Sequence, residues 1–251
     1  MEDKLQRYFL ALSYDGTAYH GWQVQQNAVS VQEKLNIALQ KILRTDIETI
    51  GAGRTDTGVH AKLLYAHFDC AVDAIPSSDR FMHSLNSLLP TDISALALFP
   101  VAPEAHARFD ATERSYEYHI HFQKDPFLQN KSWQIRDLPD VERMNKASQY
   151  LLGKQDFGCF SKSHTQVFTN ICTIKRAEWV LNEGKLVFHI TADRFLRNMV
   201  RAIVGTLLEI GLKEKAPETI LAVIQSQDRA QAGTSVPAHG LYLTKVLYPY
   251  I

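Results

Sequence analysis

The sequence predicts an α+β fold made of two tandem ferredoxin-like units, each with the element order βαββαβ. Two observations support this prediction. Segments that alternate between apolar and polar residues, as half-buried strands do, are interspersed with segments whose apolar residues recur at helical spacing, and their order is the same in both halves of the chain. Antiparallel sheets with helices packed on one face make an α+β fold. We expect the first unit to span residues 1–103, the second to span residues 104–251, and a cleft to lie between them.

The first unit is predicted from alternation, helical stripes and helix-ending signals. Residues 7–14 alternate and indicate a strand. Ser30 and Glu33 form a capping box, which marks the start of a helix, and an apolar stripe follows them. Pro90 stops the next helix. The expected strands cover residues 7–14, 46–52, 63–70 and 93–101, and the expected helices cover about 30–44 and 81–89.

The second unit repeats this order of elements without repeating the residues. Residues 114–122 alternate between apolar and polar and indicate a strand. A helix from about Asp140 ends at Gly153, since glycine is a usual residue at the end of a helix. A turn around 182–184 joins two strands, and Pro217 suits the first position of a short helix. The expected strands cover residues 114–122, 170–181, 185–191 and 241–248, and the expected helices cover 140–153, 194–211 and a short segment from 217.

The composition is that of a soluble globular protein in a reducing compartment. The 251 residues are 45% hydrophobic and 22% charged, and both values are ordinary. The polar start Met1–Lys4 lacks the apolar stretch of a signal peptide, and no apolar run approaches the roughly 20 residues of a membrane span. The cysteines are odd in number and widely spaced, which argues against a disulfide framework and a zinc site. We therefore expect a cytoplasmic protein with no membrane partner and no bound metal.

The charge of the chain permits a nucleic-acid partner without requiring one. The formal net charge is zero, which does not favour a polyanion. The local distribution of charge matters more than the sum. Residues 154–201 hold eight Lys or Arg against four Asp or Glu, so this stretch carries a charge of +4.

The chain is organised around a glycine-containing loop, Gly51–Ala61, between two predicted strands. Its glycines allow another backbone or a ligand to approach closely, and Arg54 precedes Asp56 by two positions. A nearby guanidinium favours an ionised carboxylate, and an ionised Asp held on a rigid loop can be a nucleophile. The spacing alone favours an ordinary turn residue that bonds its own backbone. The glycines match neither the dinucleotide fingerprint nor a P-loop.

Three further segments have both a structural and a functional interpretation. The run Tyr14–Gln23 is either a packed surface loop or an RNA contact made by exposed aromatic rings. Tyr116 lies in an alternating strand, and by pattern it is a core residue. Arg194, Arg197 and Arg201 are spaced i, i+3, i+7 and would share one face of the predicted helix. That face is either a solvated basic surface or a surface that holds phosphates.

Residues Gly53–Ala61 resemble the catalytic signature of the tRNA pseudouridine synthase A family, with Thr57 where that family usually has Ala. The added hydroxyl leaves the chemistry intact but can alter hydrogen bonding around Asp56. Other matches follow in the family's order along most of the chain. They lie at residues 14–23, 85–90, 106–109, 114–118, 195–201 and 240–243.

The resemblance implies that the protein converts uridine to pseudouridine in the anticodon stem-loop of tRNA, at positions 38–40, and needs no cofactor. It implies three catalytic residues. Asp56 would be the nucleophile or the base, acting on the sugar or on the uracil, and Arg201 would keep this carboxylate ionised and oriented. Tyr116 would help to remove the proton from the carbon that becomes the new attachment point. The target base would leave its stack to reach them.

The expected substrate-binding residues are Arg54, Arg197 and Leu241. Arg54 would contact a phosphate where the RNA backbone is opened, and Arg197 belongs to the basic face that could hold phosphates. Leu241 would line the pocket of the flipped base, with Leu243 as a close competitor for that role. The resemblance also implies a homodimer in which one tRNA touches both subunits.

Two other classes of function remain open. A non-catalytic RNA-binding protein would fit a ferredoxin-like sheet, but the aromatic-rich RNP1 pattern of such modules is not evident. Binding alone also gives no reason for Arg54 and Asp56 in a glycine loop. A glycoside hydrolase acting on nucleosides usually requires two carboxylates, whereas the motifs offer one.

Overall fold

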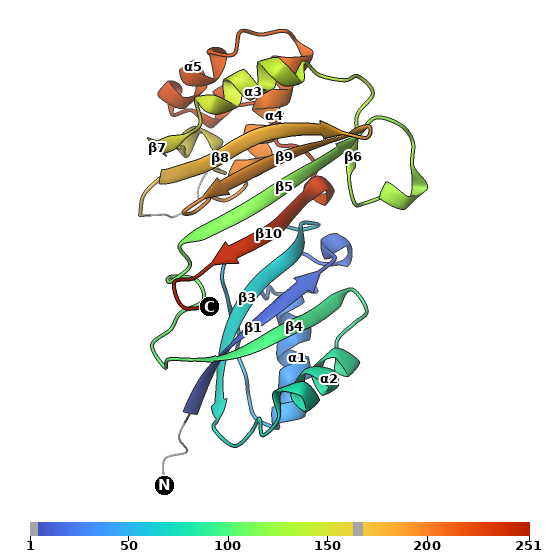
Figure 1. Ribbon diagram of the computed structural model, residues 1–251, viewed down its shortest axis with the longest axis vertical. Helices are drawn as coiled ribbons and strands as arrows, with labels where there is room; N and C mark the ends of the chain where they lie inside the picture. The colour runs from blue at the N-terminus through green and yellow to red at the C-terminus, as the bar shows by residue number, and fades with distance from the viewer. Residues whose placement is uncertain (1–4, 163–167) are drawn as a thin grey trace. The chain divides into compact units, whose positions relative to one another are not determined.

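The structure is a computed structural model that describes residues 5–162 and 168–251. The polar start Met1–Lys4, where we expect no signal peptide, lies outside the described residues. The described chain is mixed α+β, which confirms the predicted class (Figure 1). Each helix within the described ranges is too short or too polar to span a bilayer.

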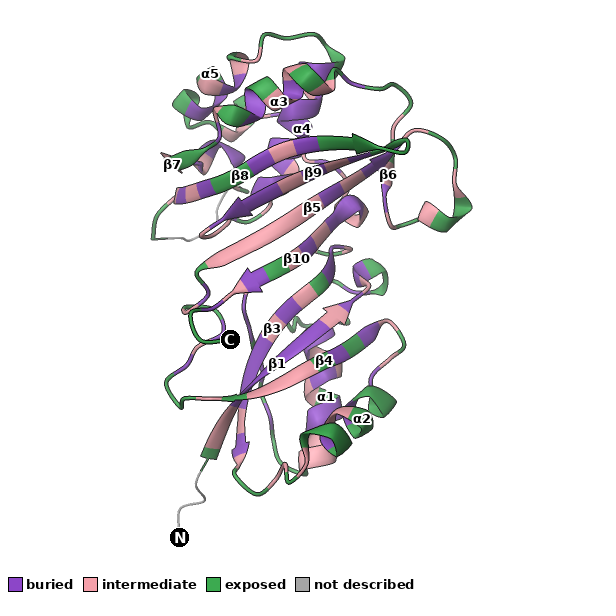
Figure 2. Cartoon of the chain, viewed as in Figure 1, coloured by how far each residue is buried: buried purple, intermediate pink, exposed green. Residues whose placement is uncertain are grey.

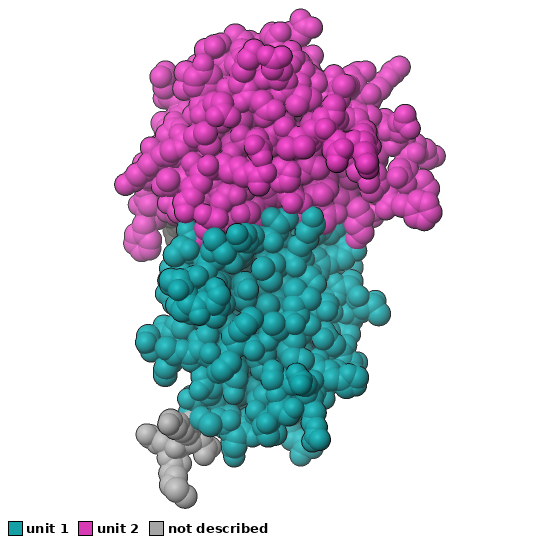
Figure 3. Space-filling view, in the orientation of Figure 1, with its two compact units in different colours: residues 1–112, 243–251 teal, residues 113–242 magenta. Residues whose placement is uncertain are grey.

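The chain divides into two compact units, which Figure 3 colours separately. Unit 1 comprises residues 1–112 and 243–251, and unit 2 comprises residues 113–242. Unit 1 therefore includes residues 104–112 and the C-terminal end, which the sequence pattern places with the second domain. Long-range hydrogen bonds hold these segments together, and no sequence pattern reveals them: Thr112 N donates to Leu247 O (2.9 Å), and Tyr248 Oη donates to Ala107 O (2.5 Å).

Unit 1 contains antiparallel strands in the order β4-β1-β3, and the short β2 also pairs with β3. Its two helices lie side by side (Figure 1). In chain order the elements are β1 (Leu5–Tyr14), α1 (Val31–Leu43), β2 (Ile50–Gly51), β3 (His60–Ala71), α2 (Ser78–Leu88) and β4 (Ile93–Val101). The predicted strand over 46–52 is thus limited to the two residues of β2.

Strand β1 is buried on both faces, whereas the alternation in the sequence predicts one buried face. The residues from Tyr8 to Leu12 are each 8% exposed or less, and Figure 2 shows the middle of β1 as a continuous buried run. Phe9, on the second face, meets the ring of Tyr248 edge-on with centroids 5.1 Å apart. The C-terminal residues therefore cover a face that local sequence gives no reason to bury.

The predicted capping box at the start of α1 is confirmed. Glu33 N donates to Ser30 Oγ (3.3 Å), and Ser30 N donates to the Glu33 carboxylate (3.4 Å), so two backbone donors of the helix end are satisfied reciprocally. The second helix, α2, ends before Pro90, as expected. Its Asn86 side chain donates to Ala95 O (2.9 Å) and accepts from Ala95 N (2.8 Å). This amide ties α2 to β4.

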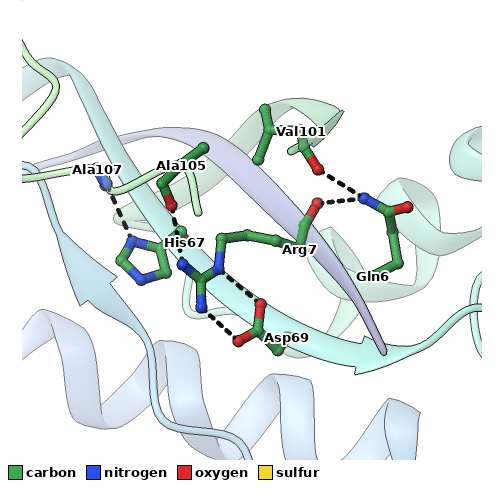
Figure 4. Close-up of polar contacts among 7 residues, drawn as sticks. All are labelled: Gln6, Arg7, His67, Asp69, Val101, Ala105 and Ala107. Carbon is green, nitrogen blue, oxygen red and sulfur yellow. Dashed lines mark hydrogen bonds and ion pairs between the residues drawn. The ribbon is translucent and has the colours of Figure 1, made fainter. Parts of the chain in front are cut away.

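A polar cluster fixes residues 105–107 against β1 and β3, as Figure 4 shows. The Arg7 guanidinium makes two bonds to Asp69 (2.8 and 2.7 Å) and donates to Ala105 O (3.0 Å). Ala107 N donates to Nδ1 of His67 (3.1 Å), whose side chain is buried. Burial, with Arg7 as a second cause, lowers the pKa of His67 to about 4.

This cluster predicts a loss of stability in mild acid. The pKa of His67 in the folded chain lies below the ordinary value of 6.5, so as the pH falls the unfolded chain is protonated at this residue before the folded chain. The contribution of neutral His67 to the free energy of unfolding is therefore complete above pH 6.5 and is lost as the pH falls toward 4. The shift corresponds to about 3 kcal/mol. We expect His67→Asn, which keeps an acceptor but cannot titrate, to flatten the pH dependence of the free energy of unfolding over this range. Urea titrations of both proteins measure it, and parallel curves would contradict the prediction.

Unit 2 contains antiparallel strands in the order β5-β9-β8-β7, and the short β6 runs parallel to β5. Helix α3 packs against β8 and α4. The elements are β5 (Glu113–His121), β6 (Trp133–Gln134), α3 (Val141–Gln149), β7 (Gly153–Asp156), β8 (Ile171–Asn182), β9 (Lys185–Ala192), α4 (Met199–Leu212) and α5 (Thr219–Ser226). A last strand, β10 (Leu241–Leu247), begins in unit 2 and ends in unit 1.

The predicted hairpin of β8 and β9 is confirmed. Glu183 and Gly184 form its two-residue turn, with φ angles of 48° and 73°, and positive φ at both positions matches the right-handed twist of the flanking strands. The bounds of α3 and α5 are among those that differ from prediction. Helix α3 ends before Gly153, which instead begins β7 with a φ of 91°, and α5 begins two residues after Pro217.

Candidate active site

The loop between β2 and β3 carries Asp56 on a tight turn. Val59 N donates to Asp56 O (3.1 Å), and Gly58 has a φ of 77°, a conformation that glycine adopts without strain. Asp56 is half-buried, whereas Arg54 and Thr57 are exposed. Asp56 is thus partly accessible, and Arg54 lies on the same loop.

Residues 14–22, at the end of β1 and in the loop after it, hold this turn in place by hydrogen bonds. Trp22 N donates to Thr55 O (3.3 Å), and Gly58 N donates to Tyr19 O (3.2 Å). The hydroxyls of Tyr14 and Thr55, both buried, share a hydrogen bond of 2.8 Å. The backbone on either side of Asp56 is therefore fixed by groups other than its carboxylate.

Two glycines make this close approach possible. A Cβ at Gly16 would lie 2.0 Å from Val59 O, and a Cβ at Gly21, whose φ is 88°, would lie 2.3 Å from Thr55 O. Sequence reasoning misses these bracing residues. The available signal is the presence of two glycines within a run of bulky aromatics, which indicates close backbone approach.

The aromatic residues of this loop pack inward, which contradicts their interpretation as an exposed RNA contact. Tyr14, Tyr19 and Trp22 are 5%, 4% and 1% exposed, so their rings cannot stack on bases. Trp22 fills the space beside Gly51, where a Cβ would come within 2.6 Å of its ring. The alternative interpretation, a packed loop, is confirmed.

Tyr116 on β5 is half-buried, and its ring meets Phe195 edge-on with centroids 5.2 Å apart. Tyr118, two residues further along, has a different environment. It is fully buried, its hydroxyl donates to Pro237 O (2.8 Å), and burial raises its pKa. Of the two tyrosines, Tyr118 is the structural one and Tyr116 retains access to the surface of unit 2.

Arg201 lies in the first turn of α4, where a backbone segment holds its side chain. Its Nε donates to Val236 O (2.7 Å), and Val236 N donates back to Arg201 O (3.3 Å). The segment reaches α4 so closely that a Cβ at Gly205 would lie 1.9 Å from Thr234 O. The Nε bond orients the guanidinium, and the backbone contacts hold the segment that accepts this bond.

The predicted arginine face of one helix is wrong, because α4 begins at Met199 and leaves Arg194 and Arg197 outside it. The Asp193 carboxylate accepts from Arg194 N (2.7 Å) and holds the chain in a bend after β9. Asn198 then has a φ of 65°, outside the helical range. Arg197 is exposed in the turn that precedes the helix.

The structure therefore places Asp56 and Arg54 on one loop of unit 1, and Tyr116, Arg197 and Arg201 in unit 2. Leu241, at the start of β10, is 6% exposed, and its competitor Leu243 is 3% exposed. The turn before β10 packs closely against β5, since a Cβ at Gly240 would come 2.8 Å from the Tyr118 ring.

A family model and several relatives agree on one family. The family model described as tRNA pseudouridine synthase matches residues 147–249. Proteins named tRNA pseudouridine synthase A are 53% identical in Bacteroides thetaiotaomicron, over 98% of this chain and 91% of that protein, and 51% identical in Bacteroides fragilis, over 98% and 97%. The protein of that name from Parabacteroides distasonis is 48% identical, also over 98% and 97%.

A solved structure of a Cbf5-Nop10-Gar1 complex includes a chain that aligns with 94% of this chain and 57% of its own length, at 13% identity and a TM-score of 0.38. A likeness this low carries no argument. The curated relatives, by contrast, match at high identity over nearly their whole length. The chain belongs to the tRNA pseudouridine synthase A family.

Proposed function

We propose that this chain is a tRNA-uridine isomerase that makes pseudouridine in the anticodon stem-loop of tRNA, at positions 38–40. The observation that carries the proposal is the carboxylate of Asp56 on a turn whose backbone is braced by buried residues on both sides. Catalysis requires such preorganisation, and a purely structural turn does not. The family to which the chain belongs supports the same reaction.

The proposed reaction needs no external reactant, because uridine and pseudouridine have the same atoms. The glycosidic C–N bond breaks, the uracil turns, and a C–C bond forms to the sugar. The new attachment carbon loses its proton, and the released ring nitrogen gains one. Asp56 acts as nucleophile or base at the sugar or the uracil, Arg201 keeps its carboxylate ionised, and Tyr116 takes part in the proton removal.

The remaining residues of the proposed site bind the RNA. Arg54 and Arg197 are both exposed and would contact phosphates, Arg54 where the backbone is opened. Leu241, or Leu243 in its place, would line the pocket of the flipped base. The proposed residues come from both units, Arg54 from unit 1 and Arg197 and Leu241 from unit 2.

We also propose a fold for each half of the chain, an oligomeric state and a cellular compartment. Each half would be a ferredoxin-like unit, with the carboxylate loop in a domain of residues 1–103 and its partners in residues 104–251. The strand order β4-β1-β3 with β2 on β3 supports this for unit 1. We further propose a homodimer in the cytoplasm that binds tRNA without a cofactor or a membrane. An odd number of widely spaced cysteines fits a reducing compartment.

The direct test is to incubate the pure protein with unmodified tRNA transcripts and to map pseudouridine at single-nucleotide resolution. We expect modification confined to positions 38–40. Free uracil among the products would instead indicate a nucleoside hydrolase, and binding with no tritium release from uracil-labelled tRNA would indicate a non-catalytic RNA-binding protein. Pseudouridine at other positions would overturn the proposed target while leaving the reaction in place.

A further inference from the structure

Unit 1 presents an aromatic ring and a guanidinium together at the end of the 105–110 segment. The ring of Phe109 is 74% exposed, and Arg108 Cζ lies 5.7 Å from its centroid. The His106 ring packs near Phe109 with centroids 4.2 Å apart. An exposed phenylalanine by itself needs no explanation, since single apolar residues are common on surfaces. The fixed backbone that carries Phe109 is the unusual feature, and it calls for an explanation.

The turn that carries Phe109 is closed by its own side chains. His106 Nδ1 accepts from Arg108 N (3.1 Å) and from Phe109 N (3.3 Å). The Asp110 carboxylate accepts from His106 N (2.7 Å) and from the Tyr250 hydroxyl (2.8 Å). The bond from His106 N is the largest cause of a lowered pKa at Asp110, so the carboxylate stays ionised and the turn stays closed at neutral pH.

The other side of the turn is held by the body of unit 1. Both polar groups of the Ala107 backbone are bonded: the N–H to His67 (3.1 Å) and the carbonyl to the Tyr248 hydroxyl (2.5 Å). Arg7 holds the carbonyl of Ala105 (3.0 Å), as Figure 4 shows. The segment is therefore fixed from residue 105 to residue 110, and only the side chains of Arg108 and Phe109 are exposed.

An exposed aromatic ring on a fixed backbone, beside a positive charge, suits one kind of partner, an unpaired base and its phosphate. Stacking on an aromatic ring is a principal means of binding single-stranded RNA, and a guanidinium adds charge complementarity to the backbone. Because the backbone that carries the ring is already fixed, little backbone entropy is lost on binding. We propose that Phe109 stacks on an unpaired base of the bound tRNA while Arg108 contacts a neighbouring phosphate. This inference rests on the proposed function, which supplies the tRNA.

The test is a series of substitutions at Phe109, with the dissociation constant of an unmodified tRNA transcript measured by filter binding. Stacking of one base contributes enough that Phe109→Ala should weaken binding about tenfold. Phe109→Leu is the matched control, since it keeps an apolar side chain without an aromatic face and should weaken binding as much as Ala. Phe109→Trp should retain the wild-type affinity. The site is exposed, so we expect all three to fold, which thermal unfolding checks.

The phosphate contact has its own readout, the dependence of affinity on salt. Arg108→Ala should reduce the slope of log Kd against log salt concentration by about 0.7 to 0.9, the value for one phosphate, whereas Arg108→Lys should preserve it. Wild-type affinity in Phe109→Leu, or an unchanged slope in Arg108→Ala, would overturn the inference. So would a change in sedimentation of Phe109→Ala without RNA, because the ring would then be a contact between copies of the chain.

The two proposals fail separately. A wild-type protein that makes pseudouridine, together with a Phe109→Ala variant that binds normally, overturns only the stacking contact. A wild-type protein that binds tRNA but makes no pseudouridine overturns the enzymatic function and leaves the comparison at Phe109 valid. A wild-type protein that does not bind tRNA overturns both.

Discussion

Asp56→Asn is expected to reduce pseudouridine formation by about 10⁴-fold, the scale on which loss of a reacting side chain is felt. Asn has the size and shape of Asp but neither attacks a carbon centre nor accepts a proton at neutral pH. The turn itself should survive, because its hydrogen bonds come from backbone groups at Thr55, Asp56 and Gly58. Affinity for tRNA should therefore change little while the chemical step is lost.

The measurement is single-turnover tritium release from tRNA labelled at carbon 5 of uracil, at saturating enzyme. Asp73→Asn is a matched control, since Asp73 is an exposed carboxylate of the same unit outside the proposed site, and it should react at the wild-type rate. If Asp56→Asn retains a rate within tenfold of wild type while Asp73→Asn is normal, Asp56 is not the reacting group.

The sequence predicts well those helices and strands whose ends are set by residues close to one another in the chain. The capping box of Ser30 and Glu33 gives the start of α1, and the turn at Glu183 and Gly184 gives the β8–β9 hairpin. Both signals involve residues within a few positions of each other, so they act before any tertiary contact forms.

The elements that sequence misses depend on contacts between distant residues. The second buried face of β1 exists because Phe9 meets Tyr248, and the C-terminal end belongs to unit 1 through bonds such as that of Tyr248 to Ala107. The late start of α4 follows from Asp193 and Asn198, whose local bonding and positive φ compete with a helix that the apolar spacing permits.

The candidate site shows the same division. The position of Asp56 on a glycine loop between two strands follows from the residues, whereas its role, and those of Tyr116 and Arg201, rest on family resemblance. The bracing of the loop by residues 14–22 does not follow from the aromatic residues alone, because aromatic residues in a polar run fit an exposed or a buried loop equally well. Their burial is decided by Gly16 and Gly21, which let two backbones meet.

Gly21→Ala is expected to damage both the fold and the reaction. The new Cβ would lie 2.3 Å from Thr55 O, and the residue would hold a φ of 88° that only glycine adopts readily. Strain of this kind, together with the forced displacement of packed backbone, should lower the free energy of unfolding by about 2–4 kcal/mol. Thr55 accepts a hydrogen bond from Trp22, the residue after Gly21, and it precedes Asp56, so the displacement should also move the Asp56 carboxylate. A misplacement of about 1 Å lowers the rate of reaction about 100-fold.

Gly53→Ala provides the control within the same pair of loops. A Cβ there would meet nothing within 4 Å, and Gly53 does not have the positive φ of Gly21, so the free energy of unfolding in urea should equal that of wild type or exceed it by up to about 1 kcal/mol. Turnover of tRNA should separate the variants further, with Gly21→Ala losing kcat at a temperature where it remains folded. Equal stability and equal kcat in the two variants would mean that the 14–22 loop does not position Asp56, and the preorganisation on which the proposed chemistry depends would have to come from elsewhere.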